Sequence, residues 1–126
     1  MELNYLVKLD NTRLNNIINN ADSNTENFIK SVGFSIEARA KMKAPVDTGA
    51  LRNSIYTDTR NTSNIPTEKD YDLPRGSRTK IYVGPTMEYA IYVEFGTSRQ
   101  SAQPYLIPAV EEVASQLNTH YRLILP

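Results

Sequence analysis

Apolar and polar residues alternate at the start of the chain, where Leu3, Tyr5, Val7 and Leu9 occupy every second position. A period of two is typical of a strand with one buried face, so we predict a strand over residues 3–9. The next apolar residues lie three or four positions apart, which predicts a short helix over residues 11–20.

A long amphipathic helix is predicted next, and its start carries a clear signal. Ser23 and Glu26 form an S-x-x-E capping box, in which each side chain can bond the free amide of the other residue. From about residue 24 onwards apolar residues recur at helical spacing, so one stripe should face a core. Pro45 ends the helix, because its ring removes an amide donor and disfavours helical geometry at the preceding residue. The predicted core stripe is Phe28, Ile29, Val32, Ile36 and Ala40.

A tight turn and two strands should follow this helix. In Asp47-Thr48-Gly49 the carboxylate can bond forward to the backbone, and the glycine can take a positive φ angle. Alternation predicts one strand over residues 51–58 and another over 79–83 that Gly84-Pro85 terminates, and the two could pair as an antiparallel ribbon. Residues 59–77 lose all apolar periodicity, so we expect a long exposed loop that is either disordered or a functional arm.

Two more helices are predicted in the last third of the chain. Thr86 is a candidate cap for a short helix that stops at Gly96, although the β-forming residues 89–95 leave a strand open. Residues 106–117 carry an apolar face at helical spacing, with Pro108 in the first turn, where a missing amide costs least. The last segment, 121–126, is too apolar for an ordinary frayed tail.

Composition limits the functions that are open to this chain. It has 126 residues, the size of a single domain, with no cysteine and one histidine, His120. Thiol chemistry and Cys-based zinc sites are excluded, so a metallohydrolase is not expected. Fourteen basic and fourteen acidic residues cancel, so no long-range field draws the protein to nucleic acid or to an anionic membrane. Neither a signal peptide nor a membrane span is visible, and we expect synthesis in the cytosol.

Four sequence blocks follow one another between residues 44 and 109. They read APVDTGALRNSI at 44–55, VGP at 83–85, YAIYVEFGT at 89–97 and QPYLIPA at 103–109. In content and order they resemble the head-to-tail joining or tail-completion family of phage neck and minor tail proteins. The residues that carry the motifs are Pro45, Asp47, Thr48, Gly49, Leu51, Arg52, Gly84, Pro85, Glu94, Phe95, Gly96, Thr97, Pro104 and Pro108.

The resemblance implies an α+β fold, in agreement with the predicted elements: a long helix packed on a small antiparallel sheet, with a short N-terminal helix and a C-terminal amphipathic helix. It also implies a ring between the DNA-filled head and the tail, no enzymatic activity and no cofactor. The segment 59–77 departs from the plainest family pattern, which leaves the length of the sheet hairpin open.

We therefore expect one domain over residues 1–126 that assembles in the host cytoplasm and resides in the virion, with no membrane partner. Its partners would be copies of itself in a ring, a head-connector protein and a tail-terminator protein, while DNA passes through the lumen unread. The loop 59–77 would order on contact with a neighbouring ring, and the tail 121–126 would dock into an adjacent subunit. A tail terminator or another minor tail protein is the alternative.

Asp47 and Glu94 are the first residues to consider for chemistry, because paired carboxylates can divide acid and base roles. The simpler interpretation is structural: Asp47 caps the turn, and Glu94 pairs with a cation. Arg52 is the candidate partner of Glu94, since a guanidinium can hold a carboxylate at two points.

Other candidate sites have weaker support. Thr48 or Ser54 with His120 could suggest a hydrolase, but His120 lies in a polar stretch with no carboxylate patterned beside it. Aromatic residues near Arg78, Lys80 and Arg99 could stack on single-stranded nucleic acid, although aromatic residues also favour protein interfaces. The candidate interface residues are Tyr82, Tyr89, Tyr92, Tyr105, Tyr121, Leu123, Ile124 and Leu125.

Overall fold

A computed structural model describes residues 7–10, 23–46, 49–62, 64–78 and 80–117. The elements lie in the order β1 (Val7–Asp10), α2 (Ser23–Lys43), α3 (Ala50–Ser54), β2 (Tyr56–Asp58), β3 (Lys80–Gly84), α4 (Ala90–Phe95) and α5 (Leu106–Leu117). The fold is α+β, as predicted. Within the described ranges no helix is both long and apolar enough to cross a membrane.

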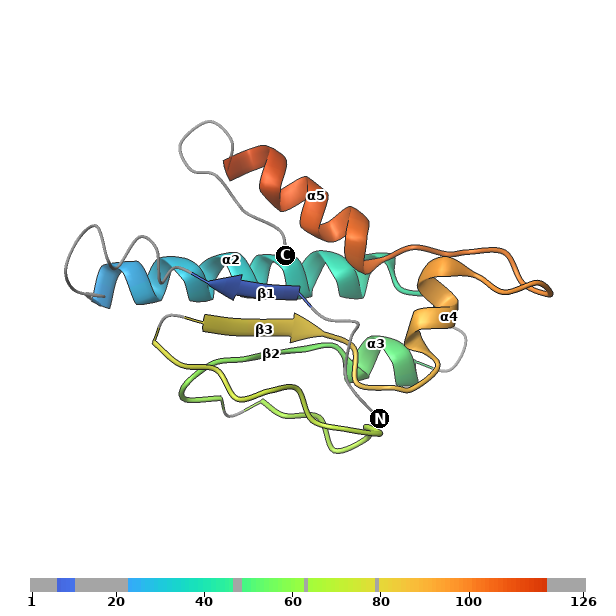
Figure 1. The fold of residues 1–126 in the computed structure, drawn as a ribbon, viewed down its shortest axis with the longest axis horizontal. Helices are drawn as coiled ribbons and strands as arrows, with labels where there is room; N and C mark the ends of the chain where they lie inside the picture. The colour runs from blue at the N-terminus through green and yellow to red at the C-terminus, as the bar shows by residue number, and fades with distance from the viewer. Residues whose placement is uncertain (1–6, 11–22, 47–48, 63, 79, 118–126) are drawn as a thin grey trace.

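The long helix α2 forms the middle layer of the molecule. Figure 1 shows the sheet along one side of α2 and α5 along the other. The predicted stripe faces this core: Ile36 and Ala40 are fully buried, and Phe28 packs against the cluster from a partly exposed position. The helix ends at Lys43, two residues before Pro45, as the sequence predicts.

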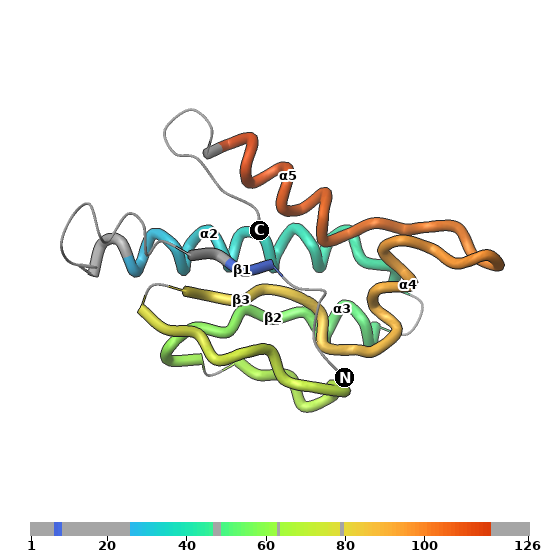
Figure 2. Tube along the Cα trace, in the orientation of Figure 1, coloured from blue at the N-terminus to red at the C-terminus, as the bar shows by residue number. Residues whose placement is uncertain are grey.

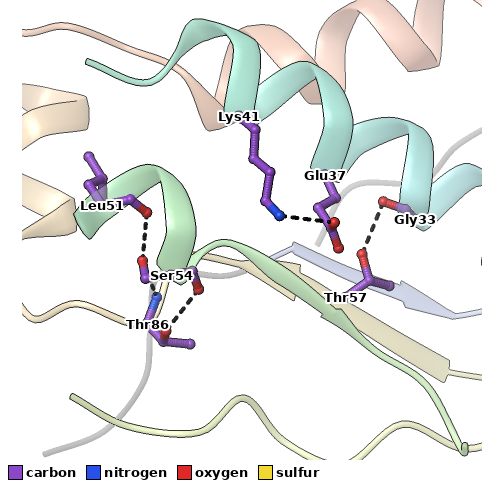
Figure 3. Close-up of polar contacts among 7 residues, drawn as sticks. All are labelled: Gly33, Glu37, Lys41, Leu51, Ser54, Thr57 and Thr86. Atoms are coloured by element: carbon purple, nitrogen blue, oxygen red, sulfur yellow. Dashed lines mark hydrogen bonds and ion pairs between the residues drawn. The ribbon is translucent and has the colours of Figure 1, made fainter. Parts of the chain in front are cut away.

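The sheet has three antiparallel strands in the order β1-β3-β2. Val83 of β3 lies opposite Val7 of β1 and Thr57 of β2. The predicted ribbon between the second and third strands is therefore present. The sheet approaches α2 closely at Gly33, where the Thr57 hydroxyl donates to the Gly33 carbonyl oxygen over 3.3 Å (Figure 3). A side chain at Gly33 would meet those of Ile81 and Thr57, so this close approach favours glycine.

The prediction of a strand over all of residues 51–58 is wrong in its first half. Gly49 takes the expected positive φ of 75°, but residues 50–54 then form the short helix α3, and only residues 56–58 are extended. Five residues cover little more than one helical turn. Leu51 and Ser54 lie three positions apart, which suits one face of a helix. The alternation along the same short segment suits a strand equally well, so the pattern does not separate the two.

The end of α3 is joined to the end of β3 by a buried pair of hydroxyl residues (Figure 3). The Ser54 hydroxyl donates to the Leu51 carbonyl oxygen over 2.7 Å and accepts from the Thr86 amide over 3.2 Å. The Thr86 hydroxyl donates to the Ser54 carbonyl oxygen over 2.8 Å. Thr86 was predicted to cap the following helix. That prediction is wrong, because the residue before α4 is Tyr89 and Thr86 instead bonds to α3.

The loop between β2 and β3 has no helix or strand in its described part, residues 59–62 and 64–78. It is not an open arm, however. The Gly76 amide donates to the Asp58 carboxylate over 2.9 Å, and the Leu73 amide donates to the Tyr56 phenol over 2.8 Å. Leu73 and Gly76 are buried, although most of the other loop residues are exposed. Figure 2 shows the loop doubling back beside β2 towards α3.

The middle of the loop is fixed as well, at Asp70. The Asp70 amide donates to the Thr86 carbonyl oxygen over 2.7 Å, and the Asp70 carboxylate accepts from the Glu88 amide over 2.8 Å. At its near end Arg60 donates to the Glu26 carboxylate of α2 over 3.1 Å. The predicted exposed loop is thus tied to β2, to α2 and to the residues just before α4.

Several expectations fall outside the described residues. These are the strand residues 3–6, the helix over 11–20, the turn residues Asp47 and Thr48, and the tail 121–126. His120 lies there too, as does the side chain of Ser23, so the capping box is not tested. The predicted last helix matches α5 from Leu106 to Leu117, and Pro108 lies in its first turn.

Candidate subunit interface

The short helix α4 is held by its inner side. Ala90 is 1% and Glu94 is 2% exposed. The Glu94 carboxylate accepts hydrogen bonds from three successive amides at the start of α5, with Oε1 2.9 Å from the Leu106 nitrogen and 3.2 Å from that of Tyr105, and Oε2 3.2 Å from that of Ile107. Since the first amides of a helix have no partner within the helix, one carboxylate here caps α5 from a different element.

This arrangement contradicts the predicted pairing of Glu94 with Arg52. Arg52 is exposed on α3, and the ion pairs among the described residues do not include one between Arg52 and Glu94. Among the described residues Glu94 binds backbone amides, which agrees with a structural role for its side chain. The carboxylate of Glu94 therefore lies against backbone in the core.

The residues after α4 form a tight arm that returns to the helix. Gly96 takes a positive φ of 77° and its amide donates to the Tyr92 carbonyl oxygen over 2.8 Å, so it stops α4 as predicted. The Thr97 amide then donates to the Gln100 carbonyl oxygen over 2.8 Å, and the Gln103 amide donates to that of Val93 over 2.8 Å. Figure 1 shows this arm projecting beyond α4 before the chain enters α5.

Tyr105 ends the arm inside the protein. It is 0% exposed, and its hydroxyl donates to the Ala90 carbonyl oxygen over 3.3 Å. The prediction that Tyr105 belongs to an interface is therefore wrong. The apolar run from Tyr105 into α5 is a signal in the sequence that could have placed it in the core.

The outer side of α4 is apolar and exposed. We call Tyr89, Ile91, Tyr92 and Phe95 the α4 face; their exposed fractions lie between 40% and 59%. Two of the predicted interface residues, Tyr89 and Tyr92, are therefore accessible, whereas Tyr82 on β3 is half-buried. Figure 1 shows the ends of α2 and α4 and the start of α5 at the same end of the molecule. Three more exposed apolar residues come from there: Met42, Val46 and Ile107.

Sequence reasoning missed Ile91 as a surface residue, because its position in the predicted helix suited a core stripe. It did not separate the two sides of α4: Ile91, Tyr92 and Phe95 are exposed around the buried pair Ala90 and Glu94, and Tyr89 just before the helix is exposed too. A helix that is apolar nearly all round is usually covered on all sides. Here one side of α4 is exposed to solvent.

Polar groups elsewhere form structural contacts. On the α2–α5 surface Arg39 and Lys43 both pair with Glu112, and the Arg39 nitrogen lies 3.0 Å from its oxygen. The hydrogen bond from Lys43 is the main cause that holds the pKa of Glu112 below its usual value. An open groove of about 510 Å³ beside them is lined by Arg39, Met42, Lys43 and Glu112. Ser54, considered as a nucleophile, is fully buried and bonded to backbone.

The described residues contain no cluster of three or more side chains suited to holding a metal ion. What the chain presents is a small α+β domain with an exposed aromatic face on a rigidly held helix, the features of a structural subunit. It belongs to the family described as "Bacteriophage HK97-gp10, putative tail-component", which matches residues 12–96. The protein is thus a structural component of the phage tail region and of the virion. Comparison with curated proteins gave no match, and comparison with solved structures gave none either.

Proposed function

We propose that this protein joins the DNA-filled head to the tail, as a head-to-tail joining or tail-completion subunit that assembles with copies of itself into a ring. The neighbours of the ring are a head-connector protein on one side and a tail-terminator protein on the other. DNA passes through the lumen without being read, and the protein performs no catalysis. The alternative position within the same class is that of a tail terminator.

The α4 face is the observation that carries this proposal. Large apolar side chains gathered on a surface mark contact sites, and aromatic residues are enriched at the energetically important centre of such sites. Because Glu94 and Tyr105 fix the inner side of α4 to the core, the face is presented in a single orientation. A rigid face loses little conformational entropy on binding.

The balance of charge supports a protein partner over a nucleic acid. The chain carries fourteen basic and fourteen acidic residues, and the α4 face itself carries no charged side chain. Phosphate contacts from Lys and Arg supply most of the affinity of non-specific nucleic-acid binding, and the α4 face offers neither residue.

The proposal is tested by complementing a phage that lacks the gene with the double variant Tyr92→Ser/Phe95→Ser. Loss of an aromatic anchor at an interface costs about 2 kcal/mol or more, so we expect the titre of infectious phage to fall by about 30-fold or more. The purified variant should lose no more than about 1 kcal/mol of the parent's free energy of unfolding, since both side chains are more than half exposed.

Phe34→Ser is the matched control, because Phe34 is 45% exposed on α2, outside the α4 face. It should complement as well as the parent. Full complementation by the double variant, or equal losses in both variants, would remove the α4 face from the assembly.

A further inference from the structure

The α4 face needs an uncharged, apolar partner surface. Its four exposed side chains are aromatic or aliphatic, and the single carboxylate of the helix, Glu94, points inward to α5. A partner that brought charged groups onto this face would lose their hydration without gaining an ion pair there.

The chain itself contains a segment of matching chemistry. Nine residues follow Leu117, and among them Leu123, Ile124 and Leu125 are three consecutive aliphatic residues between Arg122 and Pro126. Nine residues can span roughly 30 Å when extended. The segment is long enough to reach beyond the end of α5 and occupy a surface on another molecule.

The starting point of this segment and the α4 face lie far apart in one molecule. Glu94 binds the first amides of α5, so α4 adjoins the start of that helix. The twelve residues of α5 then rise by roughly 18 Å, and Figure 1 shows the helix leading away from α4. A surface at one end and its complement at the other are what a head-to-tail contact between copies requires, and such contacts form a ring when the rotation from copy to copy closes.

Docking of the segment on the α4 face of its own molecule is less favourable. The chain would have to double back along α5, over a surface groove lined by Arg39, Pro108, Glu111, Glu112, Ser115 and Gln116. Aliphatic side chains laid there would cover the charged groups of Arg39, Glu111 and Glu112 and remove their hydration without offering hydrogen bonds in return. The α4 face of the next copy involves no such cost.

We infer that residues 121–126 of one copy dock on the α4 face of the next copy and so link neighbouring subunits of the ring. The inference rests on the proposed function, since it needs copies to assemble side by side. It assigns the partner of α4 as a second copy of this chain, and it names the segment that makes the contact.

Because the chain has no cysteine, the contact can be tested by placing thiols with no background. Phage that lacks the gene is complemented by two variants together, Tyr92→Cys and Leu125→Cys, and the purified particles are oxidised. We expect a disulfide-linked dimer that contains one copy of each variant. Ile91→Cys with Leu125→Cys is a second pairing on the same face, and Phe34→Cys with Leu125→Cys is the control. The control should form at least about tenfold less dimer.

The outcomes separate this inference from the proposed function. Particles that contain the chain but give equal dimer with the control pairing overturn the docking of the tail and leave the joining role standing. An intrachain disulfide in the double variant Tyr92→Cys/Leu125→Cys, with no mixed dimer, overturns it in favour of docking within one molecule. Joined, infectious particles that lack the chain in every pairing, the Phe34→Cys control included, overturn both.

Discussion

The carboxylate of Glu94 connects two helices that are separated by ten residues of chain. It is 2% exposed and accepts from the amides of Tyr105, Leu106 and Ile107. A buried amide that is left without an acceptor carries the cost of desolvation, about 1–3 kcal/mol for each unsatisfied group. The single residue therefore fixes both the start of α5 and the inner side of α4.

Glu94→Ala should lower the free energy of unfolding by about 2–4 kcal/mol, because it leaves three amides without this acceptor. Glu94→Gln keeps one amide oxygen in place and should cost clearly less. Urea unfolding followed by circular dichroism measures both variants. Equal, small losses in the two would show that the capping bonds contribute little to stability.

The phenol of Tyr56 gives stability a dependence on alkaline pH. Burial raises its pKa above the ordinary value of 10.0, against the smaller lowering effect of the Leu73 amide bond. The unfolded chain thus releases this proton at a lower pH than the folded chain does. The stability that this phenol contributes is fully present below pH 10, and it is lost as the pH rises from there towards the pKa of the folded state.

Tyr56→Phe should therefore flatten the decline of stability above pH 10, at the cost of about 1 kcal/mol at neutral pH for the lost bond to Leu73. Burial also raises the pKa of Tyr71, so Tyr71→Phe should flatten part of the same decline. Tyr92→Phe, on the exposed α4 face, is the control. An identical decline in all three variants would mean that these buried phenols do not set the alkaline limit.

At the scale of elements, the β2–β3 loop positions the residues that precede α4. Its contacts run from Asp58 and Tyr56 on β2 to Thr86 and Glu88 beyond β3. Gly76 is the tightest point, since a side chain there would meet the Asp58 carbonyl oxygen and Thr59 backbone at 2.5–2.8 Å. Backbone cannot move aside as easily as the end of a side chain can.

Gly76→Ala should release the loop from β2 and lower the free energy of unfolding by about 1–3 kcal/mol. Hydrogen exchange should rise at the Leu73 and Gly76 amides, which lose protection when the loop lifts. Thr67→Ala, at an exposed position of the same loop, should change neither quantity. Unchanged exchange in Gly76→Ala would show that the loop holds its place by other contacts.

The predictability of each element depended on its length and on how local its contacts are. The helices α2 and α5 repeat their apolar spacing over several turns, so the sequence placed both within a residue or two at each described end. The helix α3 has five residues, too few to separate a period of 3.6 from a period of two. The capping of α5 by Glu94 joins residues eleven to thirteen apart and leaves no periodic trace.

The candidate site was predictable in part for the same reasons. The sequence marked Tyr89 and Tyr92 as contact residues, and both are exposed. It also marked Tyr105, which is fully buried in the core. An aromatic residue suits a core and an interface equally, so only its place in the fold separates the two. Ile91 joins the α4 face because the buried side of α4 is already filled by Ala90 and Glu94.

At the scale of the whole molecule, the described elements form three layers, and the exposed α4 face lies at one end of them. The sheet, α2 and α5 form the body, and α4 with its arm lies where α2 ends and α5 begins (Figure 1). The tied loop and the buried hydroxyl pair make this end rigid. A rigid domain with an exposed apolar face at one end is suited to building a closed ring.

Deletion of the gene from the parent phage, followed by electron microscopy of the lysate, tests the joining role most directly. We predict full heads and finished tails that lie apart, with normal numbers of each, and recovery of joined particles when the intact gene is supplied. Intact, infectious particles in the absence of the gene would contradict a role in joining head to tail.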